Sequence, residues 1–203
     1  MRIRPISPPL LVEEIADRIA AADPASRPRV AVDGAPAARP DDLADALAGP
    51  LRLRGREVVR VSAGDFLRPA SLRLEHGHTD PDVFYDEWLD AGGLVREVLG
   101  PLGPGGSGRV LPALWDSTAD RAARTPYVTL PPGGVLLLDG TLLLGRGLPF
   151  DLSVHLWLSP PALARKTAAE ERWTLPAYAR YEEERVADLV VRVDHPDRPA
   201  LVE

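Results

Sequence analysis

Five short segments of the chain consist almost entirely of apolar residues and are bounded by Gly, Pro, Asp, Ser or charged residues. Uninterrupted apolar runs of this length are typical of strands that are buried on both faces of a sheet. The predicted strands are residues 29–33, 57–62, 134–139, 153–158 and 189–193. Such strands belong to parallel sheets that are covered by helices.

Between and before these strands, apolar residues recur at three- and four-residue spacing, which predicts amphipathic helices. The predicted helices are residues 10–22, 41–51, 83–99, 161–172 and 175–185. Gly92 and Gly93 are expected to break or bend the third of them. Helices that alternate with apolar strands predict an α/β fold of three layers, with a five-stranded parallel sheet covered by helices.

Composition and charge favour one folded domain and exclude several kinds of partner. The 203 residues can bury a full core, and the net charge of -6 is spread along the chain, so neither nucleic acid nor a membrane is an expected partner. The longest apolar stretch, residues 135–144, is too short to span a bilayer. Because the chain lacks cysteine and its N-terminal segment lacks a secretory pattern, we expect a cytoplasmic protein.

Three loops follow the carboxyl ends of predicted strands, at residues 33–42, 62–69 and 139–141. Ligands of parallel α/β sheets bind beyond these ends. The sequence therefore predicts that the three loops converge on one site.

Five motifs follow one another along the chain: "VAVDG" (30–34), "VSAGDFLRP" (61–69), "GHTDPDVFYDEWLD" (77–90), "VLGPLGPGGSG" (98–108) and "LLLDGTLLL" (136–144). In this order they resemble the uridine kinase and related nucleoside kinase family of P-loop phosphotransferases. The resemblance implies a P-loop NTPase-like fold in a single domain over residues 1–203. The resemblance covers roughly residues 29–193 and implies a lid-like helical region at about residues 160–186, and residues 1–28 are expected to form an N-terminal helical extension.

The phosphate loop departs from the family's pattern G-x-x-x-x-G-K-[ST]. Gly34 matches the first glycine, but Arg39, Pro40 and Asp41 stand where Gly, Lys and Ser or Thr are needed. The loop thereby loses a close backbone approach, a cation, a backbone donor and a magnesium-binding hydroxyl. Asp41 and Asp42 would repel phosphate by about 4 kcal/mol per unit charge at roughly 4 Å. We therefore expect a degenerate Walker A motif that is hostile to ATP.

The family's general base and lid are also altered. The general-base aspartate aligns with Gly64, and Asp65 lies one residue later. The lid lacks the family's arginine–aspartate pair, and Lys166 is the only lysine that could replace the missing loop cation. Asp65 and Lys166 are therefore the candidate catalytic residues.

Asp139 matches the acidic residue of the Walker B strand, which helps to organise magnesium in the family. Asp33, Asp65 and Asp139 are expected to form a carboxylate cluster at the mouth of the sheet. A divalent cation would satisfy such a cluster, so a weak magnesium site at Asp33 and Asp139 is expected. Mg-ATP is a cofactor only if the phosphate site works in a non-standard way.

The resemblance also places aromatic residues around a nucleoside base. Stacking on an aromatic ring needs no phosphate chemistry, so such a pocket can exist without ATP binding. The candidate pocket residues are Phe66, Arg68, Tyr85, Trp88, Trp115 and Asp116. The competing interpretation is that these aromatics pack under the lid and the long loops. His155 is expected to be a packed core histidine, and residues 182–185 to be a solvated helix end.

Three functions remain open from the sequence. The first is a uridine kinase-like pseudokinase that binds a nucleoside-like small molecule. The second is an active uridine or cytidine phosphotransferase, in which Arg39 or Lys166 supplies the cation and Asp65 the base. The third is a protein-interaction module that uses the N-terminal helix or the helix at residues 83–99. A homo-oligomer is compatible with each of them.

Overall fold

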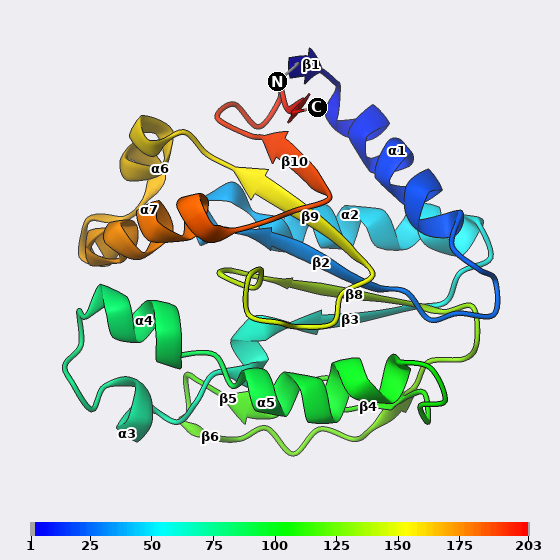
Figure 1. Cartoon of the computed structure of the whole chain (residues 1–203), viewed down its shortest axis with the longest axis horizontal. Helices are drawn as coiled ribbons and strands as arrows, with labels where there is room; N and C mark the ends of the chain where they lie inside the picture. The colour runs from blue at the N-terminus through cyan, green and yellow to red at the C-terminus, as the bar shows by residue number, and fades with distance from the viewer. Residues whose placement is uncertain (1–2, 203) are drawn as a thin grey trace.

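The computed structural model describes residues 3–202, and within this range the chain forms a central sheet of seven strands (Figure 1). In spatial order the strands are β1 (Ile3–Pro5), β11 (Ala200–Val202), β10 (Leu189–Arg192), β9 (Leu152–Trp157), β2 (Arg29–Gly34), β8 (Val135–Gly140) and β3 (Val58–Ser62). The last five are parallel to one another. They correspond to the five strands predicted from the sequence, so the predicted fold class is confirmed.

Two strands at one side of the sheet, β1 at its edge and β11 next to it, were not predicted. β11 runs antiparallel to both β10 and β1, and each of the two strands has only three residues. Strands this short carry no periodic signal, and they form because the two ends of the chain pair with each other (Figure 1). The sheet therefore has two strands more than expected.

Helices cover both faces of the sheet. They are α1 (Pro8–Ala20), α2 (Pro40–Leu53), α3 (Ala70–Arg73), α4 (Pro81–Glu87), α5 (Ala91–Leu94), α6 (Pro160–Lys166) and α7 (Leu175–Glu184). Turns of 3-10 type lie at Pro36–Ala38, Ala63–Phe66, Gly100–Leu102 and Ala169–Thr174, and a π turn lies at Val95–Leu99. On one face, α1 and α2 pack against alternate strand residues such as Val135 and Leu137. On the other face, α5, the π turn and α7 pack against Leu136 and Leu138.

The predicted helix at residues 83–99 is two helices, and the break lies before the glycines. Asp90 begins α5 by accepting a hydrogen bond from the Gly93 amide at 2.8 Å. A Cβ atom at Gly93 would lie 2.6 Å from an Asp90 carboxylate oxygen, so this cap requires glycine. The predicted helix at residues 161–172 is also shorter, because α6 ends at Lys166 and Thr167 has extended backbone angles.

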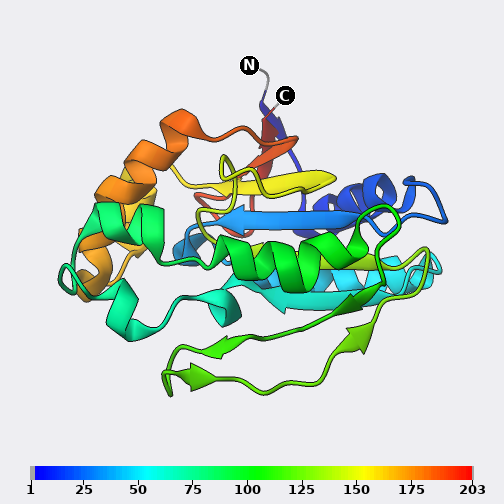
Figure 2. The ribbon, with the colours of Figure 1, turned by 60° about the horizontal axis from the view of Figure 1, so that its bottom comes forward.

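Residues 109–129 form an extended ribbon that the sequence did not predict. Here β4 (Arg109–Val110) pairs with β7 (Val128–Thr129), and β5 (Trp115–Asp116) pairs with β6 (Arg121–Ala122). Figure 2 shows this ribbon running beside α5, on the outside of the molecule. The amide of Leu114 donates to the carbonyl of Asp65 at 3.0 Å, so the ribbon holds the 3-10 turn that follows β3.

The carboxyl ends of β2, β8 and β9 point toward α4, α6 and α7, which lie together at one end of the molecule (Figure 1). The loops that follow β2 and β8 therefore lie near α6 and α7, the region for which a lid is expected. No helix within residues 3–202 is long and apolar enough to cross a membrane.

Close contact between β8 and the turn at Ala63–Phe66 gives a first prediction. A Cβ atom at Gly140 would lie 2.5 Å from the Cβ of the buried Ala63, which cannot move aside as a long side chain could. We expect Gly140→Ala to lower the free energy of unfolding by about 1–3 kcal/mol. Urea denaturation of the variant and the wild type would measure this loss of stability.

Gly49→Ala is the control, because an added Cβ meets nothing within 4 Å at this position inside α2. That substitution should stabilise the protein by about 0.5–1 kcal/mol through helix propensity. Equal effects of the two variants would contradict the close contact.

Candidate functional site

The parallel register brings four polar side chains together at the carboxyl end of the sheet. Asp33 of β2 lies beside His155 of β9, and Asp139 of β8 lies beside Ser62 of β3. Asp33 is 0% exposed and Asp139 is 6% exposed. A buried carboxylate is stable only when hydrogen bonds or counter-charges replace its water shell, so the partners of these two acids determine what the site can do.

The loop after β2 offers few backbone donors to an anion. In the 3-10 turn that follows Gly34, the amides of Ala38 and Arg39 donate to carbonyls of the turn itself, at 2.8 Å and 3.0 Å. Pro36 and Pro40 have no N–H group. Phosphate loops work by directing several amides at one anion, and the amides of Ala38 and Arg39 are already used within the turn.

Arg39 stands at the position where the family has its second glycine. Its φ angle is +60°, in the left-handed region, so the backbone keeps a conformation that glycine adopts most easily. Its guanidinium lies 2.7 Å from the Asp42 carboxylate and 3.7 Å from that of Asp41. The acids at the start of α2 therefore engage the one cation in this turn.

Asp139 is held by an arginine of the neighbouring strand. Arg60 of β3 places a guanidinium nitrogen 2.6 Å from one oxygen of Asp139, and the Ser62 hydroxyl donates to the other oxygen at 3.2 Å. The same guanidinium also contacts Asp45 of α2. Its Nε is a buried side-chain nitrogen without a hydrogen-bond partner among residues 3–202. Arg60 thus supplies the positive charge that a metal ion would otherwise bring to Asp139.

Asp33 is enclosed by groups from three other segments. Its Oδ2 atom lies 2.5 Å from His155 Nδ1 and accepts a hydrogen bond from the Tyr181 hydroxyl at 2.7 Å. Its Oδ1 atom accepts a hydrogen bond from the amide of Leu143 at 3.0 Å. Tyr181 belongs to α7, and its hydroxyl also accepts a hydrogen bond from the amide of Leu144 at 2.9 Å. Asp33 therefore links the central strand to the lid-like region.

This network continues to a second carboxylate on α7. His155 Nε2 lies 2.9 Å from Glu182, and Arg185 pairs with Glu182 at 2.8 Å. Glu182 is half-buried, so the prediction that residues 182–185 are a solvated helix end is wrong at this position. His155 is buried as predicted, but it bridges two carboxylates instead of packing only against apolar side chains.

The surroundings of His155 and Glu182 favour their charged forms. Burial lowers the pKa of His155, but its hydrogen bonds with Asp33 and Glu182 outweigh burial and raise that pKa above its ordinary value. Burial likewise raises the pKa of Glu182, but hydrogen bonds with His155 and Arg185 outweigh it and lower that pKa. The network is therefore an ion-paired chain that runs from β2 to α7.

Asp65 differs from the other acids of the site. It is half-buried in the 3-10 turn after β3, and its carboxylate accepts no hydrogen bond from any residue that the structure describes. Burial raises the pKa of Asp65, and the charges of Asp139 and Asp116 raise it further. An acceptor of this kind can bind a hydroxyl group or take up a proton.

Lys166 lies away from these acids. Its ammonium donates to the Val193 carbonyl at 3.1 Å, and its side chain lines a cavity of about 660 Å³ together with Arg39 and Asp42. The residues that line this cavity within the described chain do not include Asp33, Asp65 or Asp139. The two basic residues considered for phosphate binding thus share a cavity, but they are separated from the candidate base.

Three of the aromatic residues expected around a nucleoside, Phe66, Tyr85 and Trp88, are buried or pack against other aromatic rings. Phe66 is 0% exposed and Tyr85 is 8% exposed, so both belong to the core. Half-buried Trp88 packs edge-on against Phe84 at 5.1 Å between ring centres, and against Trp173 of the lid-like region at 5.7 Å. Through these contacts, α4 packs against the segment before α7.

The remaining predicted pocket residues lie on the ribbon and near α4. Trp115 and Asp116 are half-buried in β5, and the Trp115 indole donates to Asp120 at 3.1 Å. Arg68 is half-buried and lies 3.5 Å from the Glu87 carboxylate. Asp116, which contributes to the raised pKa of Asp65, is therefore the pocket residue that lies close to the site acids.

No group of three or more His, Asp or Glu side chains suited to hold a metal ion occurs in the part of the chain that the structure describes. A weak magnesium site at Asp33 and Asp139 remains a prediction. Magnesium would have to compete there with Arg60, His155 and Tyr181.

Four residues of the site were not recognised as functional from the sequence: Arg60, His155, Tyr181 and Glu182. Arg60 had a usable signal, because it is the one charged residue between Val58 and Ser62 of an apolar strand. Tyr181 and Glu182 follow Tyr178 at three- and four-residue spacing, which places them on the buried face of α7.

Comparisons with known proteins identify the fold of the chain. No family model and no curated protein sequence matches the chain. Among solved structures, a "Possible Uridine Kinase" from Bacillus stearothermophilus is similar with a TM-score of 0.70 and 19% identity, over 88% of this chain and 96% of that chain. A "putative fructose transport system kinase" from Silicibacter sp. TM1040 has a TM-score of 0.66 and 21% identity, over 91% and 98%.

The protein YGR205w is similar with a TM-score of 0.58 and 11% identity, over 98% of this chain and 100% of that chain. At such identities the similarity concerns the fold. The chain therefore has the α/β fold of P-loop kinases.

The ion-paired network predicts a pH dependence of stability. Because the pKa of folded His155 is raised, its contribution to stability is fully present below the unfolded value of about 6.5 and is lost as the pH rises through the folded value. We expect the difference in free energy of unfolding between the wild type and His155→Gln to shrink as the pH rises from about 6 to about 9. Urea denaturation at several pH values would measure this difference.

His78→Gln is the matched control, because His78 is exposed and should change stability little at any pH. A difference for His155→Gln that stays constant or grows with pH would contradict the raised pKa.

The ion pair between Arg60 and Asp139 predicts a conditional response to magnesium. Arg60→Gln leaves a buried carboxylate without its counter-charge and should cost about 3 kcal/mol of stability. About 10 mM magnesium chloride should then raise the melting temperature of this variant by about 2–4 °C and leave the wild type unchanged. Differential scanning calorimetry would measure both proteins.

Arg54→Gln is the control, because Arg54 pairs with Glu13 and Asp17 outside the site. A magnesium response in the wild type, or equal responses of the two variants, would show that Arg60 does not occupy a cation position.

Proposed function

We propose that the chain is a pseudokinase: a protein of kinase fold that binds a nucleoside-like small molecule and does not transfer phosphate from Mg-ATP. The observation that carries this proposal is the ion pair between Arg60 and Asp139. It places an internal cation on the one acid that matches the family's magnesium-organising residue.

The loop after β2 supports the same conclusion. Binding of a triphosphate requires backbone donors, a cation and a magnesium ligand at one place. Here the amides of Ala38 and Arg39 donate within the turn, Arg39 pairs with Asp42, and Pro40 has neither a charge nor an N–H group. Because Asp41 and Asp42 add negative charge at the start of α2, the residues present do not fit Mg-ATP.

Asp65 and its neighbours support the small-molecule part of the proposal. Asp65 is a half-buried acceptor that has no donor among the residues described, 3–202, and Asp116 and Trp115 of β5 lie on the ribbon that holds its turn. A ribose presents adjacent hydroxyl groups that carboxylates accept well, and a base presents a flat ring that stacks on an indole. A nucleoside combines both features. A similar solved structure carries the name of a uridine kinase, which agrees with this class of ligand.

An active phosphotransferase is the weaker alternative. Burial is the main cause of the raised pKa of Asp65, and a raised pKa is suitable for a general base. However, Arg39 and Lys166 line a separate cavity, so the cation and the base of that mechanism lie apart. Phosphoryl transfer requires both on one reacting group.

Isothermal titration calorimetry with uridine, cytidine, their monophosphates, Mg-ATP and Mg-GTP tests the proposal. We expect heat of binding for a nucleoside and none for either triphosphate. Asp65→Asn should weaken nucleoside binding by about 10- to 100-fold, because a hydrogen bond to a charged group contributes about 1.5–3 kcal/mol.

Asp197→Asn removes the same charge at an exposed position and should leave the affinity unchanged. Stoichiometric binding of Mg-ATP together with phosphorylation of the nucleoside would refute the pseudokinase. Nucleoside binding that is insensitive to Asp65→Asn would place the ligand elsewhere.

A further inference from the structure

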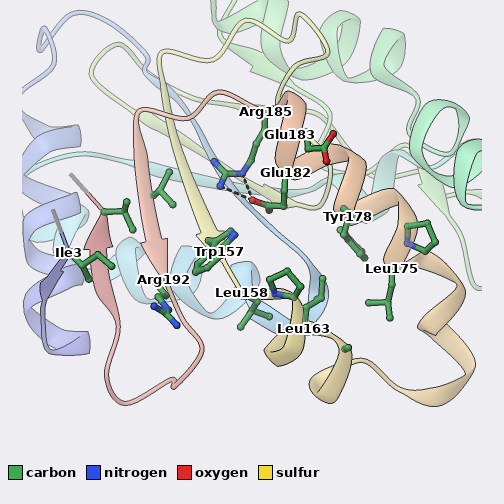
Figure 3. Close-up of a pocket in the computed structure, with 16 residues that line it drawn as sticks. Ile3, Trp157, Leu158, Leu163, Leu175, Tyr178, Glu182, Glu183, Arg185 and Arg192 are labelled. Atoms are coloured by element: carbon green, nitrogen blue, oxygen red, sulfur yellow. Dashed lines mark hydrogen bonds and ion pairs between the residues drawn. The ribbon is translucent and has the colours of Figure 1, made fainter. Parts of the chain in front are cut away.

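A pocket with mainly apolar walls lies over β10, β11 and β1, beside α7. The register places Val190 of β10 opposite Val202 of β11, and Val202 opposite Ile3 of β1. These three side chains form an aliphatic row across neighbouring strands, and Ile3 is 45% exposed although it is large and apolar. Figure 3 shows this part of the sheet as the floor of a pocket.

The pocket has walls on the side of the lid-like region. Leu163 of α6 and Leu175 and Pro176 of α7 line it opposite the sheet, and Trp157 of β9 lies at its inner end (Figure 3). The cavity measures about 1020 Å³. Ligand pockets of roughly 300–1,000 Å³ with mainly apolar walls hold single drug-sized molecules. The size and lining therefore fit a small hydrophobic ligand.

The charges at the rim set the sign of that ligand. Arg185 pairs with Glu182 at 2.8 Å, and Arg192 pairs with Asp194 at 2.7 Å. Glu183 also lines the pocket, and it is the charged lining residue for which the structure gives no ion pair within residues 3–202 (Figure 3). Glu183 is thus the rim charge with which a ligand can pair without breaking an ion pair that the structure shows.

We propose that this pocket binds a small hydrophobic molecule that carries one positive charge, such as an aromatic or aliphatic amine. The apolar body lies on the row formed by Ile3, Val190 and Val202, and the ammonium group lies near Glu183. The Arg192 guanidinium already lies over the ring of Trp157, 5.4 Å from the ring centre, so the ammonium group is expected at Glu183 and not at the indole. The described lining residues do not include Asp65, Asp116 or Asp139, so this site is separate from the proposed nucleoside site.

Calorimetric titration with three probes tests the charge preference. The probes are 4-phenylbutylamine, 4-phenylbutanol and 4-phenylbutyrate, which share a phenyl-alkyl chain and differ in their polar end group. The amine should bind about three- to fivefold more tightly than the alcohol, because an exposed ion pair contributes up to about 1 kcal/mol. The carboxylate should bind more weakly than the alcohol. Ala164→Trp, which fills the pocket from α6, should abolish binding of all three.

Glu183→Gln should reduce the preference for the amine by about threefold and leave the affinity for the alcohol unchanged. Glu170→Gln is the matched control, since Glu170 is exposed and does not line the pocket. Circular dichroism would establish that each variant is folded.

Equal affinities for the three probes would overturn the proposed charge, as would an unchanged preference in Glu183→Gln. No binding up to about 10 mM would overturn the small-molecule site. Sedimentation equilibrium would detect a second copy of the chain as the occupant: a dimer that Ala164→Trp dissociates would also overturn the proposal. These outcomes do not depend on whether Mg-ATP or a nucleoside binds.

Discussion

The burial of Asp33 is the constraint on which the rest of the site depends. Removing a carboxylate from water costs several kcal/mol unless protein groups replace the water shell. Here the replacement comes from His155 of β9, Tyr181 of α7 and the amide of Leu143, three groups that are distant in sequence. The position of α7 over the carboxyl end of the sheet is therefore coupled to the stability of the central strand. If α7 moved away, an ionised carboxylate would lose the hydroxyl of Tyr181.

Arg60 and Asp139 satisfy the same requirement on the other side of β2. In a nucleotide-binding protein, the acids at this edge face a metal ion and phosphates that bind and dissociate. Here an arginine fixed in the next strand provides the positive charge permanently. Both strands thus end in acids whose partners belong to the protein, and an incoming ligand would have to displace them. Asp65 lies close by and has no such partner in the described part of the chain, which makes it the acid most open to a ligand.

The sequence predicts the strands well because their signal is local. A continuous apolar run identifies a doubly covered strand without knowledge of its neighbours, whereas the three-residue strands β1 and β11 exist only through pairing with distant segments of the chain. The shortage of backbone donors in the loop after β2 is also visible locally, since Pro36 and Pro40 have no N–H group in any fold. In contrast, the contact between Arg60 and Asp139 joins residues that are 79 positions apart and depends on the register of two strands. Composition and spacing do not encode that register.

The two faces of α7 connect the carboxyl edge with the apolar pocket. Tyr181 and Glu182 face Asp33 and His155, and the next residue, Glu183, lines the pocket. Glu182 belongs to both, because it also lines the pocket wall while it holds His155. A cation bound near Glu183 would therefore lie one residue from the end of the ion-paired network. Tyr181 and Glu183 lie two residues apart on α7, so a shift of this helix toward such a cation would also move the hydroxyl that donates to Asp33.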